Sequence, residues 1–186
     1  MNLRGTVTVA YAMSVLCVSA CDSRTQSGSQ TEGDAETSVS RIVVGAELPD
    51  FALTSLENSE DTYTRQDLAG KVYLVDFWAT WCLPCVAELP NLHQAYESYS
   101  DDGFEILSVA MGDRRETIDE LRQTQWPMPW LHAFEPLDSE VAELFELFGV
   151  PKAILVDSSN TIVGVDEDVR GEKLQEVLAR LFGEPG

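Results

Sequence analysis

Two cysteines separated by two residues lie between an apolar run and a helix-like segment, and no other part of the chain restricts its fold as much. They are Cys82 and Cys85, within the sequence WCLPC at residues 81–85. The run before them, residues 72–78, is almost wholly apolar, as expected of a strand covered on both faces. A C-x-x-C pair between a buried strand and a helix indicates a redox-active dithiol rather than a metal-binding clip.

Apolar spacing predicts strands and helices that alternate along the chain. We expect strands at residues 51–54, 72–78, 104–111, 131–133, 152–157 and 161–165, and helices at residues 84–100, 114–124, 139–148 and 172–182. Phe148 and Leu181 are expected on the inner faces of the last two helices, whereas residues 56–66 are polar with turn character. This alternation predicts an α/β layer with parallel strand pairs, and the final hairpin adds antiparallel strands.

The chain is strongly acidic, with 32 Asp and Glu against 12 Lys and Arg and a formal charge of -20. Nucleic acid is therefore an improbable partner, because its phosphates require Lys and Arg for neutralisation. Anionic lipid headgroups would be repelled as well. The simplest reading of the charge is a solvated acidic surface that keeps the protein soluble.

The N-terminal residues indicate export rather than folding. Residues 7–20 are mostly apolar and small, follow the basic Arg4, and are too short to span a bilayer comfortably. The segment ends in VSAC, which resembles a bacterial lipobox, so residues 1–20 are predicted to be a lipoprotein signal peptide and Cys21 the lipid attachment site. The alternative is an ordinary secretory signal followed by a stray cysteine. Polar residues 21–40 then form the lipidated cysteine and a flexible linker, and residues 41–186 form the folded domain.

The chemistry expected of the dithiol follows from its place in the chain. Cys82 should lie at the N-terminus of a helix, where free backbone N–H groups and the helix dipole stabilise a thiolate. Cys82 is therefore predicted to be the nucleophile. Cys85, one turn further on and more buried, would resolve the mixed disulfide. Pro84 has no N–H and suits the first helical turn.

Two carboxylates are candidates for handling protons at this site. Asp76 lies inside the apolar run, and burial would raise its pKa enough to exchange a proton with Cys85 near neutral pH. The alternative is a structural, hydrogen-bonded Asp76. Glu88 follows Cys85 by three residues and so shares its helix face. Spacing alone leaves open whether Glu88 is functional or simply solvated.

Taken together, the motif VDFWATWCLPC at residues 75–85 and the later Gly149-Val150-Pro151 resemble the thioredoxin superfamily. Within it the chain is most similar to the TlpA/ResA-like thiol-disulfide oxidoreductases anchored outside the cytoplasm. The resemblance covers roughly residues 43–181. It implies a thioredoxin-like fold, a central mixed sheet with helices on both faces, an N-terminal β extension near residues 47–53 and an inserted β-α segment at about 104–124.

The resemblance also implies roles for individual residues. Val150-Pro151 would be a cis peptide that pairs with the substrate backbone, and Trp81 and Pro84 would contact the substrate. Glu88 would tune the cysteines. Asp76 matches the buried acid of thioredoxin, whereas many TlpA-like proteins have Asn there, so either acid could carry the proton.

By the same resemblance, the substrates would be disulfides of exported proteins, often apocytochrome c or copper-site assembly proteins. A membrane thiol-disulfide transporter would re-reduce the chain, and neither a cofactor nor a metal is implied. The protein would act as a lipoprotein at the periplasmic face of the inner membrane, or at the outer face of the plasma membrane.

Two other functions compete with this one. A peroxiredoxin-like thiol peroxidase would place Pro and Thr before a single peroxidatic Cys, a pattern that residues 80–82 lack. A copper-binding chaperone would use Cys82 and Cys85 with a third ligand, for which His93 and His132 are the only histidines.

Overall fold

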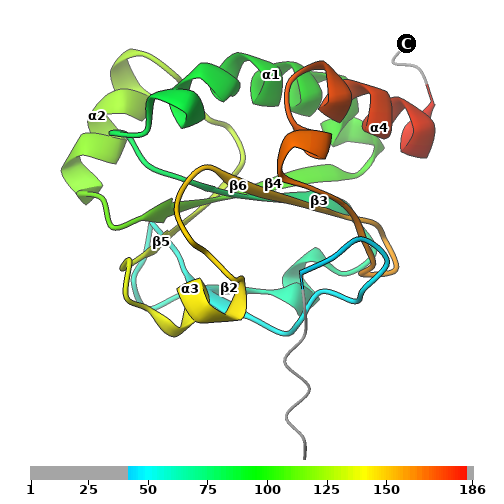
Figure 1. Cartoon of the computed structure of the whole chain (residues 1–186). Coiled ribbons are helices and arrows are strands. Elements are labelled where there is room, and N and C mark those ends of the chain that lie inside the picture. The colour runs from blue at the N-terminus through cyan, green and yellow to red at the C-terminus, as the bar shows by residue number, and fades with distance from the viewer. Residues whose placement is uncertain (1–41, 184–186) are drawn as a thin grey trace, which may run out of the picture. The chain divides into compact units, whose positions relative to one another are not determined.

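A five-stranded sheet forms the centre of the computed structural model, which describes residues 42–183 (Figure 1). Its strand order is β5-β4-β3-β6-β7. β3 (Val72–Trp78) runs parallel to β4 (Phe104–Met111), which in turn runs parallel to β5 (Leu131–Glu135). β6 (Lys152–Val156) is antiparallel to β3, and β7 (Ile162–Val165) is antiparallel to β6. The predicted mixed α/β sheet is therefore confirmed. The predicted signal peptide, Cys21 and linker lie outside the described residues.

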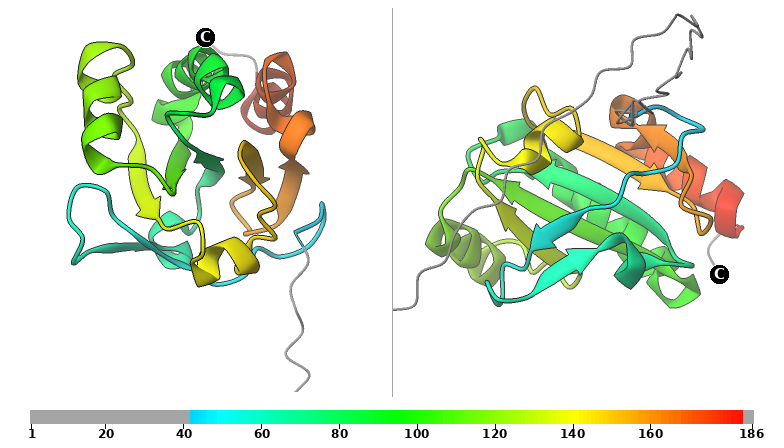
Figure 2. Two further views of the ribbon diagram at one scale, coloured as in Figure 1. Left: turned by 60° about the vertical axis from the view of Figure 1, so that its left-hand side comes forward. Right: turned by 90° about the horizontal axis from the view of Figure 1, so that it is seen from below.

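Helices cover both faces of this sheet, but unequally. α1 (Leu83–Tyr99), α2 (Arg115–Thr124) and α4 (Glu172–Phe182) lie on one face (Figure 1). The short α3 (Glu140–Leu144) lies on the other, as does an antiparallel hairpin of two further strands (Figure 2). The hairpin strands are β1 (Ala52–Thr54) and β2 (Thr62–Thr64), and single turns of 3-10 helix span Arg65–Leu68, Ser100–Asp102 and Asp166–Val169.

The alternation of side chains along β3 divides the core into two layers. Leu74 and Trp78 pack in the cluster that contains both cysteines and the inner face of α1. Val75 and Phe77 pack in the cluster on the other side of the sheet. Because alternate residues of a strand share a face, Asp76 belongs to the same face as Leu74 and Trp78. The one carboxylate within β3 therefore faces the helices that follow the dithiol.

Helix α3 is shorter than the predicted helix at 139–148, and the predicted inward position of Phe148 is wrong. Phe145 is fully buried as expected. Glu146, however, has a φ of 51°, in the left-handed region that a right-handed helix cannot continue through. The chain therefore leaves the helical path after Phe145, and Phe148 is 101% exposed.

Three smaller predictions also differ from the structure. β2 lies within residues 56–66, where no strand was predicted, because its side chains are half-buried or exposed and show no apolar alternation. β5 continues to Glu135, two residues beyond the predicted strand. Leu181 of α4 is 41% exposed rather than inward.

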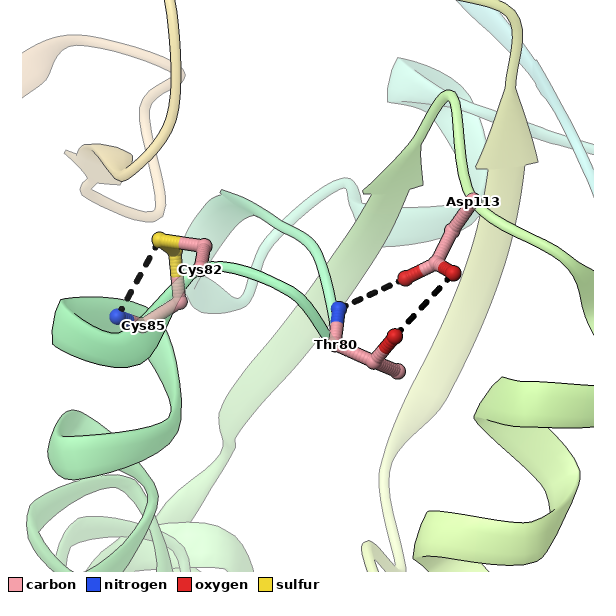
Figure 3. The surroundings of a disulfide bond; sticks show 4 residues. All are labelled: Thr80, Cys82, Cys85 and Asp113. Carbon is pink, nitrogen blue, oxygen red and sulfur yellow. Dashed lines mark hydrogen bonds between the residues drawn. A yellow bond between two sulfur atoms is a disulfide. The ribbon is translucent and has the colours of Figure 1, made fainter.

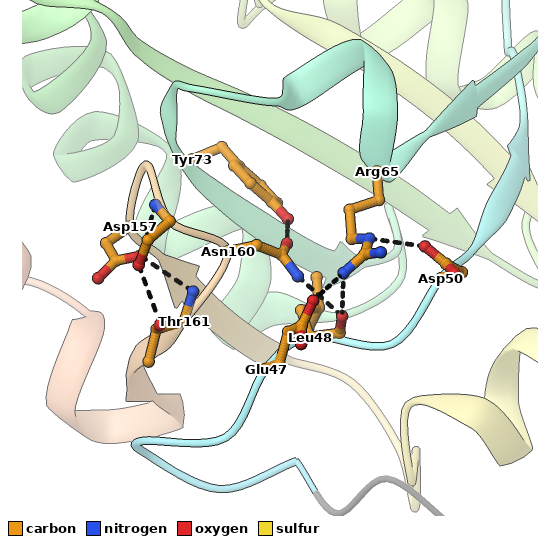
Figure 4. Close-up of polar contacts among 9 residues, drawn as sticks. Glu47, Leu48, Asp50, Arg65, Tyr73, Asp157, Asn160 and Thr161 are labelled. Carbon is orange, nitrogen blue, oxygen red and sulfur yellow. Dashed lines mark hydrogen bonds and ion pairs between the residues drawn. The ribbon is translucent and has the colours of Figure 1, made fainter.

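The N-terminal extension is held against the turn between β6 and β7 (Figure 4). The Asn160 side-chain amide in that turn donates to the Leu48 carbonyl at 3.0 Å, and the Leu48 N–H donates to the Asn160 carbonyl at 3.1 Å. Arg65 forms ion pairs with Glu47 and Asp50. Ion pairs this exposed contribute little stability, so the hydrogen bonds to Asn160 contribute more to holding the extension. It lies at the end of the sheet opposite the cysteines.

Candidate active site

The ends of three neighbouring strands meet at the edge of the sheet that carries the cysteines. Trp78 at the end of β3 pairs with Ala110 near the end of β4. Lys152 at the start of β6 pairs with Phe77. The loops that follow β3 and β4, and the loop that precedes β6, therefore converge on one edge.

The two cysteines form a disulfide at the start of α1 (Figure 3). Cys82 is the residue that caps the helix, and the backbone N–H of Cys85 donates to its sulfur at 3.3 Å. This N–H and the positive end of the helix dipole would stabilise a Cys82 thiolate. The prediction that Cys85 is the more buried of the two is wrong, because both residues are 4% exposed. Position at the helix start, rather than exposure, distinguishes Cys82.

Residues around the disulfide are unusually open to solvent for their type. Trp81 is 57% exposed and Leu83 is 80% exposed, and Pro84 is also exposed. Pro84 lies in the first turn of α1, as predicted. An apolar rim around two buried sulfur atoms is suited to contact with another polypeptide.

The loop before the motif is held by Asp113, which the sequence analysis did not identify. The Thr80 backbone N–H and hydroxyl donate to the two Asp113 carboxylate oxygens at 2.6 Å and 3.1 Å (Figure 3). Asp113 follows β4, so this clamp ties the ends of β3 and β4 together. The Cys82 N–H then donates to the Ala79 carbonyl at 3.1 Å, which closes the turn leading into α1. Nothing in the local sequence around Asp113 marks it as a partner of Thr80.

The peptide bond between Val150 and Pro151 is cis, as the family resemblance implied. Pro151 immediately precedes β6, whose first residue pairs with Phe77. Val150 packs against the core cluster that includes both cysteines. The structure therefore brings the Val150-Pro151 loop to the disulfide although about 65 residues separate them in the sequence.

Asp76 is buried, with 6% of its surface exposed, on the face of β3 toward α1. Burial raises the pKa of its carboxyl, the positive charge of Arg170 lowers it, and the nearby Glu88 raises it, and together they bring the pKa to about 7. A group that titrates near pH 7 can exchange protons at physiological pH.

Glu88 is half-buried and engaged rather than freely solvated. One carboxylate oxygen accepts the Gly171 N–H at 2.6 Å, and the other accepts the Asn91 side chain at 3.2 Å. Glu88 thus ties α1 to the residue that caps α4. Its proximity raises the pKa of Asp76, so the two candidate acids are coupled through charge.

Arg170 is a further charged residue that the sequence did not single out. It precedes Gly171, and it is the counter-charge that lowers the pKa of Asp76. Its Nη2 is buried and has no hydrogen-bond partner among residues 42–183. The residue comes from the far end of the chain, between the 3-10 helix Asp166–Val169 and α4.

The histidines lie in apolar surroundings. The His93 ring contacts the Trp130 ring edge-on, with centroids 4.9 Å apart. His132 on β5 is 1% exposed, and burial lowers its pKa to about 3. Within residues 42–183, no three His, Cys, Asp or Glu side chains are arranged to hold a metal ion.

Known proteins resemble this chain in sequence and in structure. Residues 44–165 match the AhpC/TSA family. The thiol-disulfide oxidoreductase ResA of Bacillus thuringiensis subsp. konkukian is 26% identical over 144 residues, which cover 76% of this chain and 78% of ResA.

Two solved structures have the same fold. The thioredoxin domain of a thiol-disulfide oxidoreductase from Bacteroides vulgatus has a TM-score of 0.67 and 27% identity, over 75% of this chain and 98% of that domain. A thiol:disulfide interchange protein from Bacteroides sp. has a TM-score of 0.66 and 27% identity, over 76% and 91% of the two chains. The chain belongs to the AhpC/TSA family, and it is a thioredoxin-like thiol-disulfide oxidoreductase similar to ResA.

Proposed function

We propose that this oxidoreductase reduces disulfides of exported proteins outside the cytoplasm, with Cys82 as nucleophile and Cys85 as resolving thiol. The observation that carries the proposal is the disulfide at the start of α1, at the same end of the sheet as the cis Val150-Pro151 peptide. A pair that can hold two electrons as thiols, or release them by forming this bond, is what thiol-disulfide exchange requires.

The reaction begins with the reduced protein. The Cys82 thiolate attacks one sulfur of the substrate disulfide, forms a mixed disulfide, and releases the other substrate sulfur as a thiolate that takes up a proton. Cys85 then loses its proton to the Asp76 carboxylate and attacks the Cys82 sulfur. The second substrate thiol leaves, and the protein is oxidised to the Cys82–Cys85 disulfide. Two electrons from a membrane thiol-disulfide transporter would restore the dithiol.

Exposed groups around the sulfurs would bind the substrate. Trp81 and Pro84 offer apolar surface on the helix side. Val150 and Pro151 offer backbone on the sheet side, where an extended substrate segment could pair. The acids Asp76 and Glu88 destabilise a thiolate nearby, and so destabilise the dithiol form relative to the disulfide. A dithiol of this kind gives up its electrons readily, which favours a reducing protein over a strongly oxidising one.

Tethering to a membrane would come from a lipid on Cys21 and not from a spanning helix of the folded domain. Among residues 42–183, no helix is both long and apolar enough to cross a bilayer. We expect a labelled fatty acid to be incorporated into the wild-type chain in bacterial cells and to be absent from Cys21→Ser. Label retained by Cys21→Ser would contradict lipidation at this residue.

Neither competing function has a specific observation in its favour. A copper chaperone needs a third ligand, and the two histidines are packed against aromatic or buried groups instead. A peroxidase of the peroxiredoxin kind uses a distant resolving cysteine, whereas here the bonded partner is three residues away. On the family resemblance alone, we propose apocytochrome c and copper-site assembly proteins as substrates.

Trapping tests the proposed reductase. Cys85→Ala can form the mixed disulfide through Cys82 but cannot resolve it, so it should accumulate covalently bound to disulfide-containing exported proteins. The complexes should disappear on treatment with dithiothreitol and in the double variant Cys82→Ser/Cys85→Ala. If Cys85→Ala forms no complex with an unfolded, oxidised exported protein, this protein is not a reductase of that substrate class.

A further inference from the structure

An apolar ledge lies next to the loop that carries the cis peptide. We define it by Leu137, which follows β5, and by Leu147 and Phe148, which follow α3. Phe148 is 101% exposed and Leu137 is 57% exposed. The three side chains line two adjoining hollows, of about 180 and 430 Å³. Exposed apolar groups gathered in this way mark a contact surface more often than scattered ones do.

The ledge adjoins both loops that build the redox site. On one side its inner hollow is lined by Gly149 and Val150, immediately before Pro151. On the other side Leu137 lies against Gly112, where an added Cβ would overlap the Leu137 side chain. Gly112 is followed by Asp113, which clamps Thr80. A polypeptide bound at the cysteines would therefore reach the ledge as it continues past the cis peptide.

The outer hollow has an acidic rim. Asp138, Glu143 and Glu146 line it together with the apolar residues, and no Lys, Arg or His lines either hollow. A second copy of this chain, with its net charge of -20, would be repelled here. Anionic lipid headgroups would be repelled for the same reason. A polypeptide segment that matches this surface carries an apolar side chain for the ledge and Lys or Arg side chains for the acidic rim.

We propose that the ledge docks the segment of substrate that flanks the reactive cysteine, with an apolar side chain over Phe148 and Leu137 and Lys or Arg facing the acidic rim. This inference rests on the proposed reductase function and names the substrate segments that it prefers. An unfolded segment binds in this way because apolar burial supplies contact energy while opposite charge speeds its approach.

Short peptides test the preference directly. Each carries one cysteine joined through a disulfide to 5-thio-2-nitrobenzoate. The residues that flank this cysteine are leucine and lysine in the first peptide, leucine and glutamate in the second, and serine and lysine in the third. An excess of the reduced protein reduces the disulfide and releases yellow 5-thio-2-nitrobenzoate. At low salt we expect the leucine-lysine peptide to react about tenfold faster than the leucine-glutamate peptide, and this ratio to shrink as salt is added.

Two variants locate the preference on the ledge. Asp138→Asn/Glu143→Gln/Glu146→Gln should lose most of the lysine preference, and Phe148→Ser should lose the preference for leucine over serine. The matched control Asp119→Asn/Glu120→Gln/Glu176→Gln removes three exposed acids from α2 and α4. It should keep the ratio near that of the wild type. Phe148 is fully exposed, so its replacement by serine should not affect folding.

The outcomes separate this inference from the function on which it rests. A protein that reduces none of the peptides contradicts the proposed reductase. Equal rates for all peptides, or equal losses in the ledge and control triple variants, contradict the ledge alone. A wild-type dimer that Phe148→Ser converts to monomers, without a change in peptide preference, would assign the ledge to self-association and overturn the proposal.

Discussion

Cys82→Ser is expected to abolish reduction of disulfides in an unfolded protein, with turnover at least roughly a thousandfold below that of the wild type. A serine hydroxyl at the start of α1 stays protonated at neutral pH and cannot attack a disulfide sulfur, so the first bond never forms. Cys85→Ser should behave differently. It keeps the nucleophile, so it should react once and then stall as the mixed disulfide.

Rapid mixing with a slight excess of substrate would distinguish the two variants. Cys85→Ser should release at most one equivalent of substrate thiol in a fast phase, and Cys82→Ser should show no fast phase. Denaturant unfolding, with the wild type reduced, controls for damage to the fold. If Cys85→Ser shows no fast phase and Cys82→Ser does, the roles of the two cysteines are reversed.

Asp76→Asn is expected to make the oxidised protein more stable and the enzyme slower, with both effects depending on pH. Below about pH 4 the wild-type Asp76 carboxyl is protonated in both the folded and the unfolded chain, so its ionisation does not lower the free energy of unfolding. Between the ordinary value of 3.8 and the folded pKa of about 7, only the unfolded chain loses this proton. Wild-type stability therefore falls as pH rises through this window and is constant above it.

Asparagine removes the titration but keeps the shape of the side chain. The stability gained by Asp76→Asn over the wild type should therefore grow by about 3 kcal/mol between about pH 5 and about pH 8. Denaturant unfolding of the oxidised forms measures this difference. Asp119→Asn on the exposed face of α2 controls for the loss of one formal charge. A gain independent of pH would contradict titration of Asp76 in the folded protein.

The same substitution should slow the resolving step, because Cys85 would lose its proton acceptor. At about pH 7 we expect the rate of resolution to fall by about 100-fold, the lower end of what a positioned base contributes. Decay of the mixed disulfide after rapid mixing reports this rate. A variant that is more stable but equally fast would show that Asp76 carries no proton from Cys85.

Much of the fold could be predicted because burial leaves a clear pattern in the sequence. β3 and β4 are nearly continuous apolar runs, and α4 repeats its apolar residues at helical spacing, so their predicted bounds match the structure. Asp76 was found for the same reason, since a single acid inside a buried run stands out. Edge and loop elements lack such a pattern. The hairpin strand β2 is polar. α3 ends just before Glu146, whose left-handed backbone conformation could not be predicted from the neighbouring sequence.

The parts of the site that could be predicted either belong to the cysteine motif or match the family pattern, as Val150-Pro151 does. Cys82 caps α1, and Cys85 and Glu88 lie in its first turns, so the motif identifies them together. Asp113 follows β4 and Arg170 precedes α4, and folding of the chain brings each of them to the site. Neither residue lies in a recognisable motif, so the folded structure was needed to find them.

We propose that Cys82 and Cys85 carry the electrons of disulfide reduction. The most direct test mixes the reduced wild-type protein with an unfolded, oxidised substrate and maps all disulfides by mass spectrometry after rapid acid quenching. One Cys82–Cys85 disulfide should appear for each substrate disulfide lost. Loss of substrate disulfides without formation of this bond, or no loss at all in the presence of the reduced dithiol, would contradict the claim.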